Sequence, residues 1–285
     1  MTWRSTTNRL LDRAGYQLIG SESLAKIRDG AERDKLRRRK RRVAAAAPKP
    51  KRQPTLPADY TQDSREIWEL VRGRTMIGHD KVNFLCDAVR YVERYGIPGA
   101  VVECGVWRGG AMLAVAHSLD RLGAHERELY LYDTFAGMPE ATERDVHIWN
   151  HRTAEEVLAR RSKAAPIWQP ASLEDVREGF ASASYPAERV HFVAGKVEET
   201  IPEQAPEQIA ILRLDTDWYE STKHELAHLY QRLAPGGLLV IDDYGSWEGS
   251  REATDEFLEA TGEPLMLVRI GRTRVAVKPG LASAV

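Results

Sequence analysis

Short apolar segments separated by helical patterns constrain the fold of this chain more than any other feature of its sequence. The segments at 97–104, 208–215 and 238–242 are apolar over most of their length and do not alternate apolar with polar residues. Two further strand-like segments lie at 128–133 and 189–195. Strands that are buried on both faces of a parallel sheet have this composition. The sequence therefore predicts a doubly wound α/β domain with parallel central strands.

Helical patterns and a final pair of strands complete the predicted fold. The helical patterns occur at 80–96, 109–123, 221–237 and 250–262. Thr222 and Glu225 have the spacing of a capping box near the start of the third pattern. Gly236 and Gly237 mark its predicted end. The segment 265–279 predicts two strands about a tight turn. The expected result is a mostly parallel, seven-stranded sheet that ends in an antiparallel hairpin.

The first 60 residues differ from the rest of the chain in charge and composition. Seven of the eight residues from Lys35 to Arg42 are Lys or Arg, and a Pro- and Ala-rich stretch follows them. Like charges repel one another, and proline cannot continue a helix. We therefore interpret residues 1–60 as a flexible, solvated appendage and residues 61–285 as the folded domain. The alternative is weak contact of residues 35–52 with an anionic surface.

Charge, cysteine content and hydropathy exclude several classes of protein. The formal net charge of −1 gives no reason to expect a nucleic-acid partner. Cys86 and Cys104 are too few for a disulfide framework, which favours a reducing compartment. No apolar run approaches the roughly 18 residues of a membrane span, and the N-terminus lacks the apolar core of an export signal. We expect a cytoplasmic protein.

The stretch VVECGVWRGG, residues 101–110, places an acid and glycines directly after the first predicted strand. Gly105 and Gly109 allow a tight turn into a helix N-terminus, where a backbone can approach a ligand closely. The spacing differs from the G-x-G-x-x-G of dinucleotide folds, and Glu103 favours a cationic ligand group over a pyrophosphate. Asp133 ends the second strand, where it can accept hydrogen bonds from ribose hydroxyls. These features favour S-adenosylmethionine, although both acids could instead cap helices.

A second group of acids follows the fourth and fifth predicted strands. Asp215, Asp242 and Asp243 lie in the segments LRLDTDWYEST and LLVIDDYGSW. Three clustered carboxylates repel one another unless a cation neutralises them, and oxygen ligands suit Mg²⁺, Ca²⁺ or Mn²⁺. Adjacent strand residues face opposite ways, so Asp242 and Asp243 can share an ion only where the strand is already turning. Otherwise the acids are turn residues or helix caps.

Several of these segments together resemble the macrocin O-methyltransferase family. The similar segments are RTMIGHDKVNFLCDAVRYV, IPGAVVECGVWRGGAM, LYDTFAGMP, ASLEDVREGF, VHFVAGKVEETIP, LRLDTDWYESTKHEL and APGGLLVIDDYG, and they extend over about residues 73–278. The resemblance implies a Rossmann-like class I methyltransferase that uses S-adenosylmethionine and Mg²⁺ to methylate hydroxyls, typically on sugars of macrolides and aminocoumarins.

The resemblance also implies roles for particular residues. The expected cofactor-binding residues are Thr75, Met76, Glu103, Gly105, Gly109, Asp133, Gly195, Lys196 and Val197. Asp215, Asp242 and Asp243 are the expected Mg²⁺ ligands.

An insertion at about residues 141–169 departs from the family's pattern, where such enzymes build a lid over the acceptor. It contains His147, Trp149, His151 and Trp168, and aromatic platforms with polar groups suit sugar or aromatic acceptors. The alternative is a surface helical insertion with an ordinary share of aromatic residues.

The sequence as a whole predicts an Mg²⁺-dependent O-methyltransferase that acts on a hydroxyl of a small molecule, expected to be a sugar. Asp215 is the first candidate for the base, and His147 or His151 is the alternative. Two other classes compete with this prediction. One is a nucleotide-binding oxidoreductase, and the other is a non-catalytic scaffold that docks on an anionic surface through its basic arm. We also expect a homo-oligomer.

Overall fold

The computed structural model describes residue 35 and residues 56–160 and 170–280 of the 285-residue chain. The rest of the basic block, the insertion's end at 161–169 and its Trp168 lie outside the described residues. The described residues from Leu56 onward belong to one compact unit. None of the described helices combines the length and the apolar character that a membrane crossing requires.

The centre of this unit is a seven-stranded sheet with the order β3-β2-β1-β4-β5-β7-β6. The strands are β1 (Ala100–Cys104), β2 (Leu129–Asp133), β3 (Val190–Ala194), β4 (Ile209–Leu214), β5 (Leu233–Ile241), β6 (Val268–Ile270) and β7 (Thr273–Val277). The first five are parallel to one another, and β7 pairs antiparallel with both β5 and β6. The prediction of a mostly parallel sheet with a C-terminal antiparallel hairpin is confirmed.

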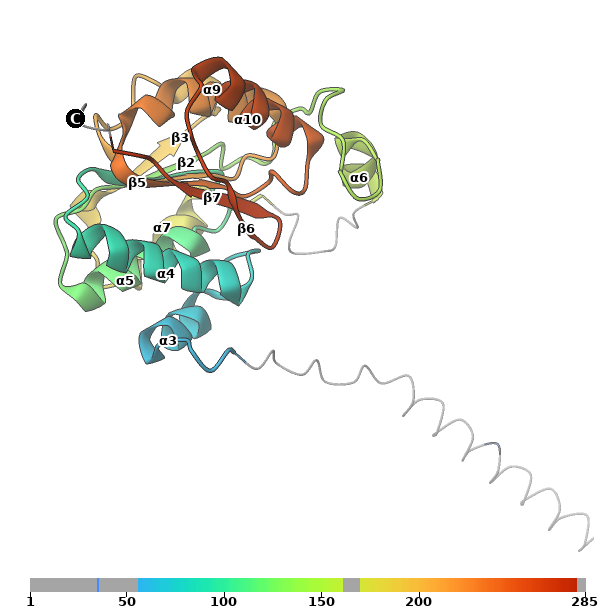
Figure 1. Ribbon diagram of the computed structural model, residues 1–285. Helices are drawn as coiled ribbons and strands as arrows, with labels where there is room; N and C mark the ends of the chain where they lie inside the picture. The colour runs from blue at the N-terminus through green and yellow to red at the C-terminus, as the bar shows by residue number, and fades with distance from the viewer. Residues whose placement is uncertain (1–34, 36–55, 161–169, 281–285) are drawn as a thin grey trace, which may run out of the picture. The chain divides into compact units, whose positions relative to one another are not determined.

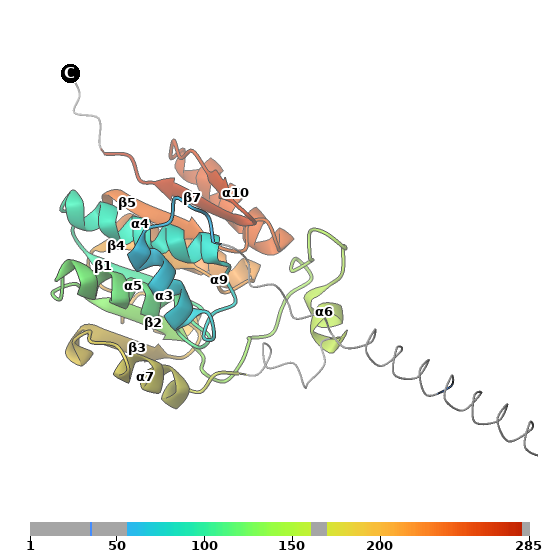
Figure 2. The same cartoon turned by 90° about the horizontal axis from the view of Figure 1, so that it is seen from below.

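Helices cover both faces of the sheet (Figures 1 and 2). One face carries α3 (Gln62–Val71), α4 (His79–Arg94), α5 (Gly110–Leu122) and α7 (Leu173–Ala181), and the other carries α9 (Tyr219–Leu229) and α10 (Glu248–Thr261). The short helices α6 (Ala154–Arg160) and α8 (Val197–Thr200) follow β2 and β3.

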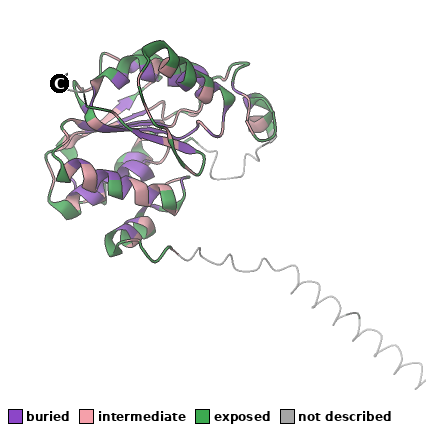
Figure 3. Ribbon diagram, viewed as in Figure 1, coloured by how far each residue is buried: buried purple, intermediate pink, exposed green. Residues whose placement is uncertain are grey.

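Each face of the sheet has its own hydrophobic cluster because successive strand residues point to opposite faces. Val101 packs with α4 and α5, whereas its neighbour Val102 packs with α9. The central strands are therefore buried throughout, as the burial colouring of Figure 3 shows.

The prediction for the third helical pattern is wrong at both ends. Helix α9 begins at Tyr219, so Thr222 lies inside it, and Thr222 and Glu225 are both buried and form no capping box. Gly236 and Gly237 do not end the helix but lie inside β5. There the pairing with β4 shifts register between Leu233 and Leu238. Gly236 has a φ of 80°, a conformation that glycine adopts without strain, so the pair accommodates a bulge.

The order of the strands determines where a ligand can bind. The chain moves outward from β1 to β2 and β3, then returns to place β4 on the other side of β1. In such sheets the crevice lies at the carboxyl ends of the strands, at this switch point. The acids that follow β1, β2, β4 and β5 therefore meet at one edge of the sheet.

Candidate functional site

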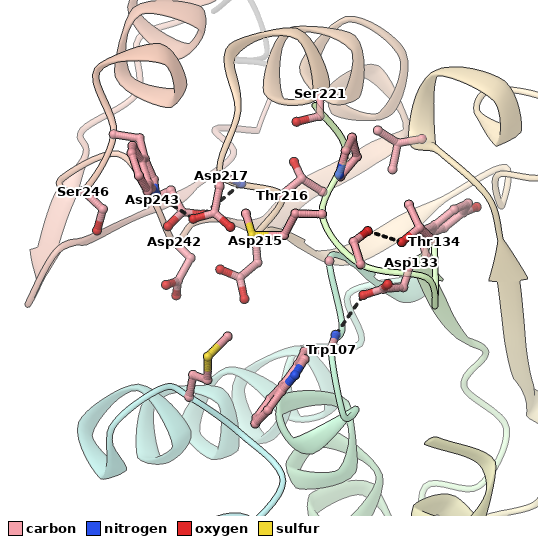
Figure 4. A pocket seen from close by; sticks show the side chains of 18 of the residues that line it. Trp107, Asp133, Thr134, Asp215, Thr216, Asp217, Ser221, Asp242, Asp243 and Ser246 are labelled. Carbon is pink, nitrogen blue, oxygen red and sulfur yellow. Dashed lines mark hydrogen bonds between the residues drawn. The ribbon is translucent and has the colours of Figure 1, made fainter. Parts of the chain in front are cut away.

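A cavity of about 630 Å³ opens at the carboxyl ends of the central strands (Figure 4). It brings together most of the candidate residues: Met76, Gly105, Asp133, His147, Gly195, Lys196, Val197, Asp215, Asp242 and Asp243. In Figure 4, Asp215, Asp242 and Asp243 lie together on one side, and Asp133 and Trp107 lie on the other. The two predicted groups of acids thus face the same space from adjoining positions.

Four candidate residues are not among those that line the cavity: Thr75, Glu103, Gly109 and His151. Thr75 instead accepts a hydrogen bond from the backbone of Ile77, at 3.3 Å. Gly109 is the N-cap of α5, with a φ of 74°. The side chain of His151 is 79% exposed and lies 3.6 Å from Glu248.

The glycines after β1 allow other segments of the chain to pass closely. Gly105 lines the cavity with a φ of 83°, and an added Cβ would overlap the carbonyl oxygen of Asp215. An added Cβ on Gly110 would overlap the carbonyl of Arg74. The sequence explained these glycines by the approach of a ligand, and the structure shows that they also admit neighbouring backbone.

Asp133 holds two turns beside the cavity. Its carboxylate accepts the backbone N–H of Trp107 at 2.9 Å and that of Phe135 at 2.8 Å. Both residues have positive φ angles, 48° and 50°, which non-glycine residues adopt only when their surroundings enforce it. Burial raises the pKa of Asp133, against these hydrogen bonds. Each carboxylate oxygen has capacity for a further donor, such as a ribose hydroxyl.

The three predicted metal ligands do converge. One oxygen from each of Asp215, Asp242 and Asp243 lies within 4.8 Å of the other two. Strand β5 ends at Ile241, so the chain is already turning at the two adjacent aspartates. This is the condition under which neighbouring residues can face one site. Burial raises the pKa of Asp215 and of Asp243 well above the usual range.

A buried arginine that the sequence analysis missed lies behind this cluster. Arg213 of β4 is 3% exposed and donates to Asp215 Oδ2 at 2.7 Å and to Asp242 Oδ1 at 2.8 Å. It also donates to Glu103, its direct neighbour on β1. The signal was present, since each of these two apolar strands contains one charged residue of opposite sign.

Glu103 therefore pairs with Arg213 inside the sheet and lies behind the cavity. It is 1% exposed, and burial raises its pKa to about 7 although the guanidinium opposes this shift. Its Oε2 has no hydrogen-bond partner among the described residues. A direct contact of Glu103 with the cofactor stays a prediction, and its position favours a structural role.

Lys81 is a second cation that the sequence analysis did not single out. It lies in the first turn of α4 and donates to Asp242 Oδ2 at 2.8 Å. Burial opposes ionisation of Asp242, but Arg213 and Lys81 outweigh it and lower the pKa of this carboxyl to about 2. Asp242 is thus held as a carboxylate.

Asp217 is a further cavity residue, in the turn after β4. Its φ of 68° is unusual for a residue other than glycine, and such strain is concentrated at functional sites. Its Oδ1 accepts from Trp247 Nε1 at 2.6 Å, and its backbone N–H donates to Asp243 Oδ2 at 3.2 Å. Burial, together with Asp215, raises its pKa to about 7. Its spacing of two residues from Asp215 in the sequence was the available signal.

The described part of the insertion is fastened beside the cavity. Asp145 is fully buried, and its Oδ1 accepts the backbone N–H of Tyr219 at the start of α9, at 2.8 Å. Its Oδ2 accepts the backbone N–H and the hydroxyl of Thr142, at 2.7 Å and 3.0 Å. His147 lies edge-on to Trp247, with ring centroids 5.3 Å apart, and lines the cavity. Trp149 is 59% exposed.

The donor set of the aspartate cluster fits a divalent cation. All the donors are carboxylate oxygens, the preferred ligands of Mg²⁺. Counting Asp217, four carboxylates face two cationic side chains, Lys81 and Arg213. The site therefore has negative charge left for a divalent cation to neutralise.

Comparison with known proteins identifies relatives of this chain. The family model for macrocin O-methyltransferases matches residues 18–278. The mycinamicin III 3''-O-methyltransferase of Micromonospora griseorubida is 34% identical over 220 residues, which cover 76% of this chain and 84% of the relative. The 8-demethyl-8-(2,3-dimethoxy-alpha-L-rhamnosyl)-tetracenomycin-C 4'-O-methyltransferase of Streptomyces olivaceus is 33% identical over 216 residues, 74% of this chain and 77% of the relative. The solved structure of the O-methyltransferase NovP superposes with a TM-score of 0.64 at 29% identity and covers 73% of this chain and 83% of NovP.

Proposed function

Because this chain belongs to the macrocin O-methyltransferase family, whose members depend on S-adenosylmethionine, we propose that it methylates a sugar hydroxyl of a small molecule with the aid of Mg²⁺. Membership of this family makes the protein an S-adenosylmethionine-dependent O-methyltransferase, and it answers the choice against an oxidoreductase and against a non-catalytic scaffold. The observation that carries the finer proposal is the aspartate cluster in the same cavity as Gly105 and Asp133.

The choice of a sugar rests on the relatives. The name of the tetracenomycin relative specifies a rhamnosyl group, and both relatives named above modify complex small molecules. The cavity of this chain suits such an acceptor because it combines aromatic and polar side chains. His147 and Trp247 lie on the side of the insertion. We assign the acceptor to this side and residues 141–169 to its lid.

The cofactor side comprises Met76, Gly105, Asp133 and the segment from Gly195 to Val197. S-adenosylmethionine supplies the electrophilic methyl group. Asp133 would accept hydrogen bonds from its ribose hydroxyls, and Gly105 leaves space for its backbone-side approach.

The metal side comprises Asp215, Asp242 and Asp243. A bound Mg²⁺ supplies a Lewis acid that lowers the pKa of a coordinated hydroxyl. Arg213 holds Asp215 and Asp242 from behind, so the chain itself fixes the spacing of two of the three ligands.

For the base we now favour Asp217 over the earlier candidates. One oxygen of Asp215 is already paired with Arg213, and His151 points into solvent. Asp217 lines the cavity, is oriented by Trp247, and has a pKa of about 7 that suits a proton acceptor near neutral pH. In this assignment Asp217 takes the proton of the acceptor hydroxyl, and the acceptor oxygen takes the methyl group. Asp215 and His147 stay as alternatives.

The test uses a panel of glycosides, including rhamnosides, with product formation measured by mass spectrometry. Activity should vanish in EDTA and return with Mg²⁺, whereas binding of S-adenosylmethionine, measured by titration calorimetry, should largely survive. Asp217→Asn should abolish turnover at saturating Mg²⁺ with little loss of cofactor affinity. Full activity in EDTA would refute the metal assignment. Full activity of Asp217→Asn would return the role of base to Asp215 or His147.

A further inference from the structure

Lys81 lies between the aspartate cluster and the start of α4. Its side chain is 18% exposed and lines the cavity, and its Nζ is 2.8 Å from Asp242 Oδ2. Among the described residues that line the cavity, it is the one cation that is ion-paired with the cluster. Arg213 contacts the same carboxylates from inside the sheet and does not line the cavity.

The hydrogen bonds of Asp242 restrict how a divalent cation could reach it. Its Oδ1 accepts from Arg213 Nη2 at 2.8 Å and from Thr273 Oγ1 at 3.0 Å. A carboxylate oxygen has about two lone-pair sites, so these two donors fill Oδ1. The other oxygen, Oδ2, accepts only from Lys81 among the described residues. A cation that binds Asp242 must therefore use the oxygen that Lys81 holds.

Sharing this oxygen brings two cations close together. An Mg²⁺ ion lies about 2.1 Å from its oxygen ligands, which places it within about 5 Å of the Lys81 ammonium at its present position. We propose that Lys81 is a built-in competitor for the divalent cation, which holds Asp242 when the cation is absent and lowers the affinity of the site. This inference rests on the metal assignment of the proposed function.

Such a competitor has a physical use in this site. A buried carboxylate without a partner destabilises the fold, and Lys81 provides Asp242 with a partner before any metal arrives. When the cation binds, only the flexible lysine side chain has to move, because Arg213 and Thr273 stay on the other oxygen.

The test compares Mn²⁺ affinity, measured by electron paramagnetic resonance of free Mn²⁺, in the wild type and in Lys81→Met. Removing one positive charge at this distance should lower the Mn²⁺ Kd on the order of tenfold, even at the dielectric constant of water. Lys81→Arg keeps the charge and should keep the wild-type affinity. Lys223→Met removes a lysine that pairs with Glu256 outside the cavity, and it should change nothing.

Each outcome bears on the proposal. A Mn²⁺ affinity of Lys81→Met that equals or falls below that of the wild type overturns it. Binding by Lys81→Met but not by the wild type supports it. If neither protein binds Mn²⁺, this inference fails together with the metal assignment, whereas wild-type binding without a gain in the variant overturns this inference alone. S-adenosylmethionine titration and a thermal melt verify folding, and Lys81→Gln replaces the methionine variant if that variant does not fold.

Discussion

Replacing Asp133 with alanine tests how one carboxylate organises the cofactor side of the cavity. The change removes the acceptor of two backbone N–H groups, from Trp107 and Phe135. Both residues have positive φ angles, and such strain costs about 1–3 kcal/mol per residue unless the surroundings hold it. Without Asp133 the two turns lose the group that holds them, and water in the open cavity replaces it only in part.

The size of the effect follows from these contacts. A hydrogen bond to a charged group contributes about 1.5–3 kcal/mol, and one to a neutral group about 0.5–1.5 kcal/mol. Because the carboxylate borders a cavity that water can enter, we take the lower part of the range. The two loop hydrogen bonds then account for about 2–3 kcal/mol of unfolding free energy. Loss of the expected ribose contact should raise the S-adenosylmethionine Kd about 10–150-fold.

The assay combines calorimetric titration of S-adenosylmethionine with denaturant unfolding. Asp133→Asn keeps one carbonyl acceptor and should lie between the wild type and Asp133→Ala. Asp120→Ala serves as the control, since that residue pairs with His125 on α5 and does not line the cavity. An unchanged Kd in Asp133→Ala would refute the ribose contact, and an unchanged unfolding free energy would show that the turns are held by other groups.

Four further predictions concern the glycine turn, the buried acid, the insertion and the arm. Gly105→Ala should destabilise the fold by well over the roughly 1–2 kcal/mol of left-handed strain, because its Cβ meets backbone, whereas Gly123→Ala should cost the strain alone; equal losses in denaturant unfolding would contradict this. Glu103→Gln should leave the S-adenosylmethionine Kd within about twofold, since this side chain lies behind the cavity, and a loss above tenfold in calorimetry would restore a direct contact. Residues 141–160 should exchange amide hydrogens more slowly once an acceptor is bound, and equal rates would count against a lid. Deleting residues 1–55 should preserve a cooperative thermal melt, and loss of that transition would place a structural element in the arm.

The convergence of the acids could be predicted because it follows from topology alone. Parallel strands that are joined by helices end at the same edge of a sheet, so Asp133, Asp215 and Asp242 had to meet near the switch point. The order of the strands in space, by contrast, determines which side chains are neighbours. It places Glu103 beside Arg213 and turns a predicted cofactor contact into a buried ion pair.

Other misses came from local signals that tertiary structure overrides. Gly236 and Gly237 were typical of a helix end, but α9 ends earlier and the glycines serve a bulge in β5. The strained turn at Asp217 could not be predicted because a positive φ in an aspartate leaves no trace in composition or periodicity. Lys81 lies in a helix far from Asp242 in the sequence, so only the folded chain brings the two together.

The buried carboxylate of Asp145 separates two evolutionary tasks within one chain. It fixes the entry to the insertion on the first residue of α9, the helix that follows the aspartate turn, and Pro170 borders the cavity where the described chain resumes. Sequence between these two points can diverge without loosening the catalytic carboxylates. Residues 146–169 thus form a natural cassette for grafting from relatives, with Asp145 and Pro170 as the splice points for chimeras of altered acceptor preference.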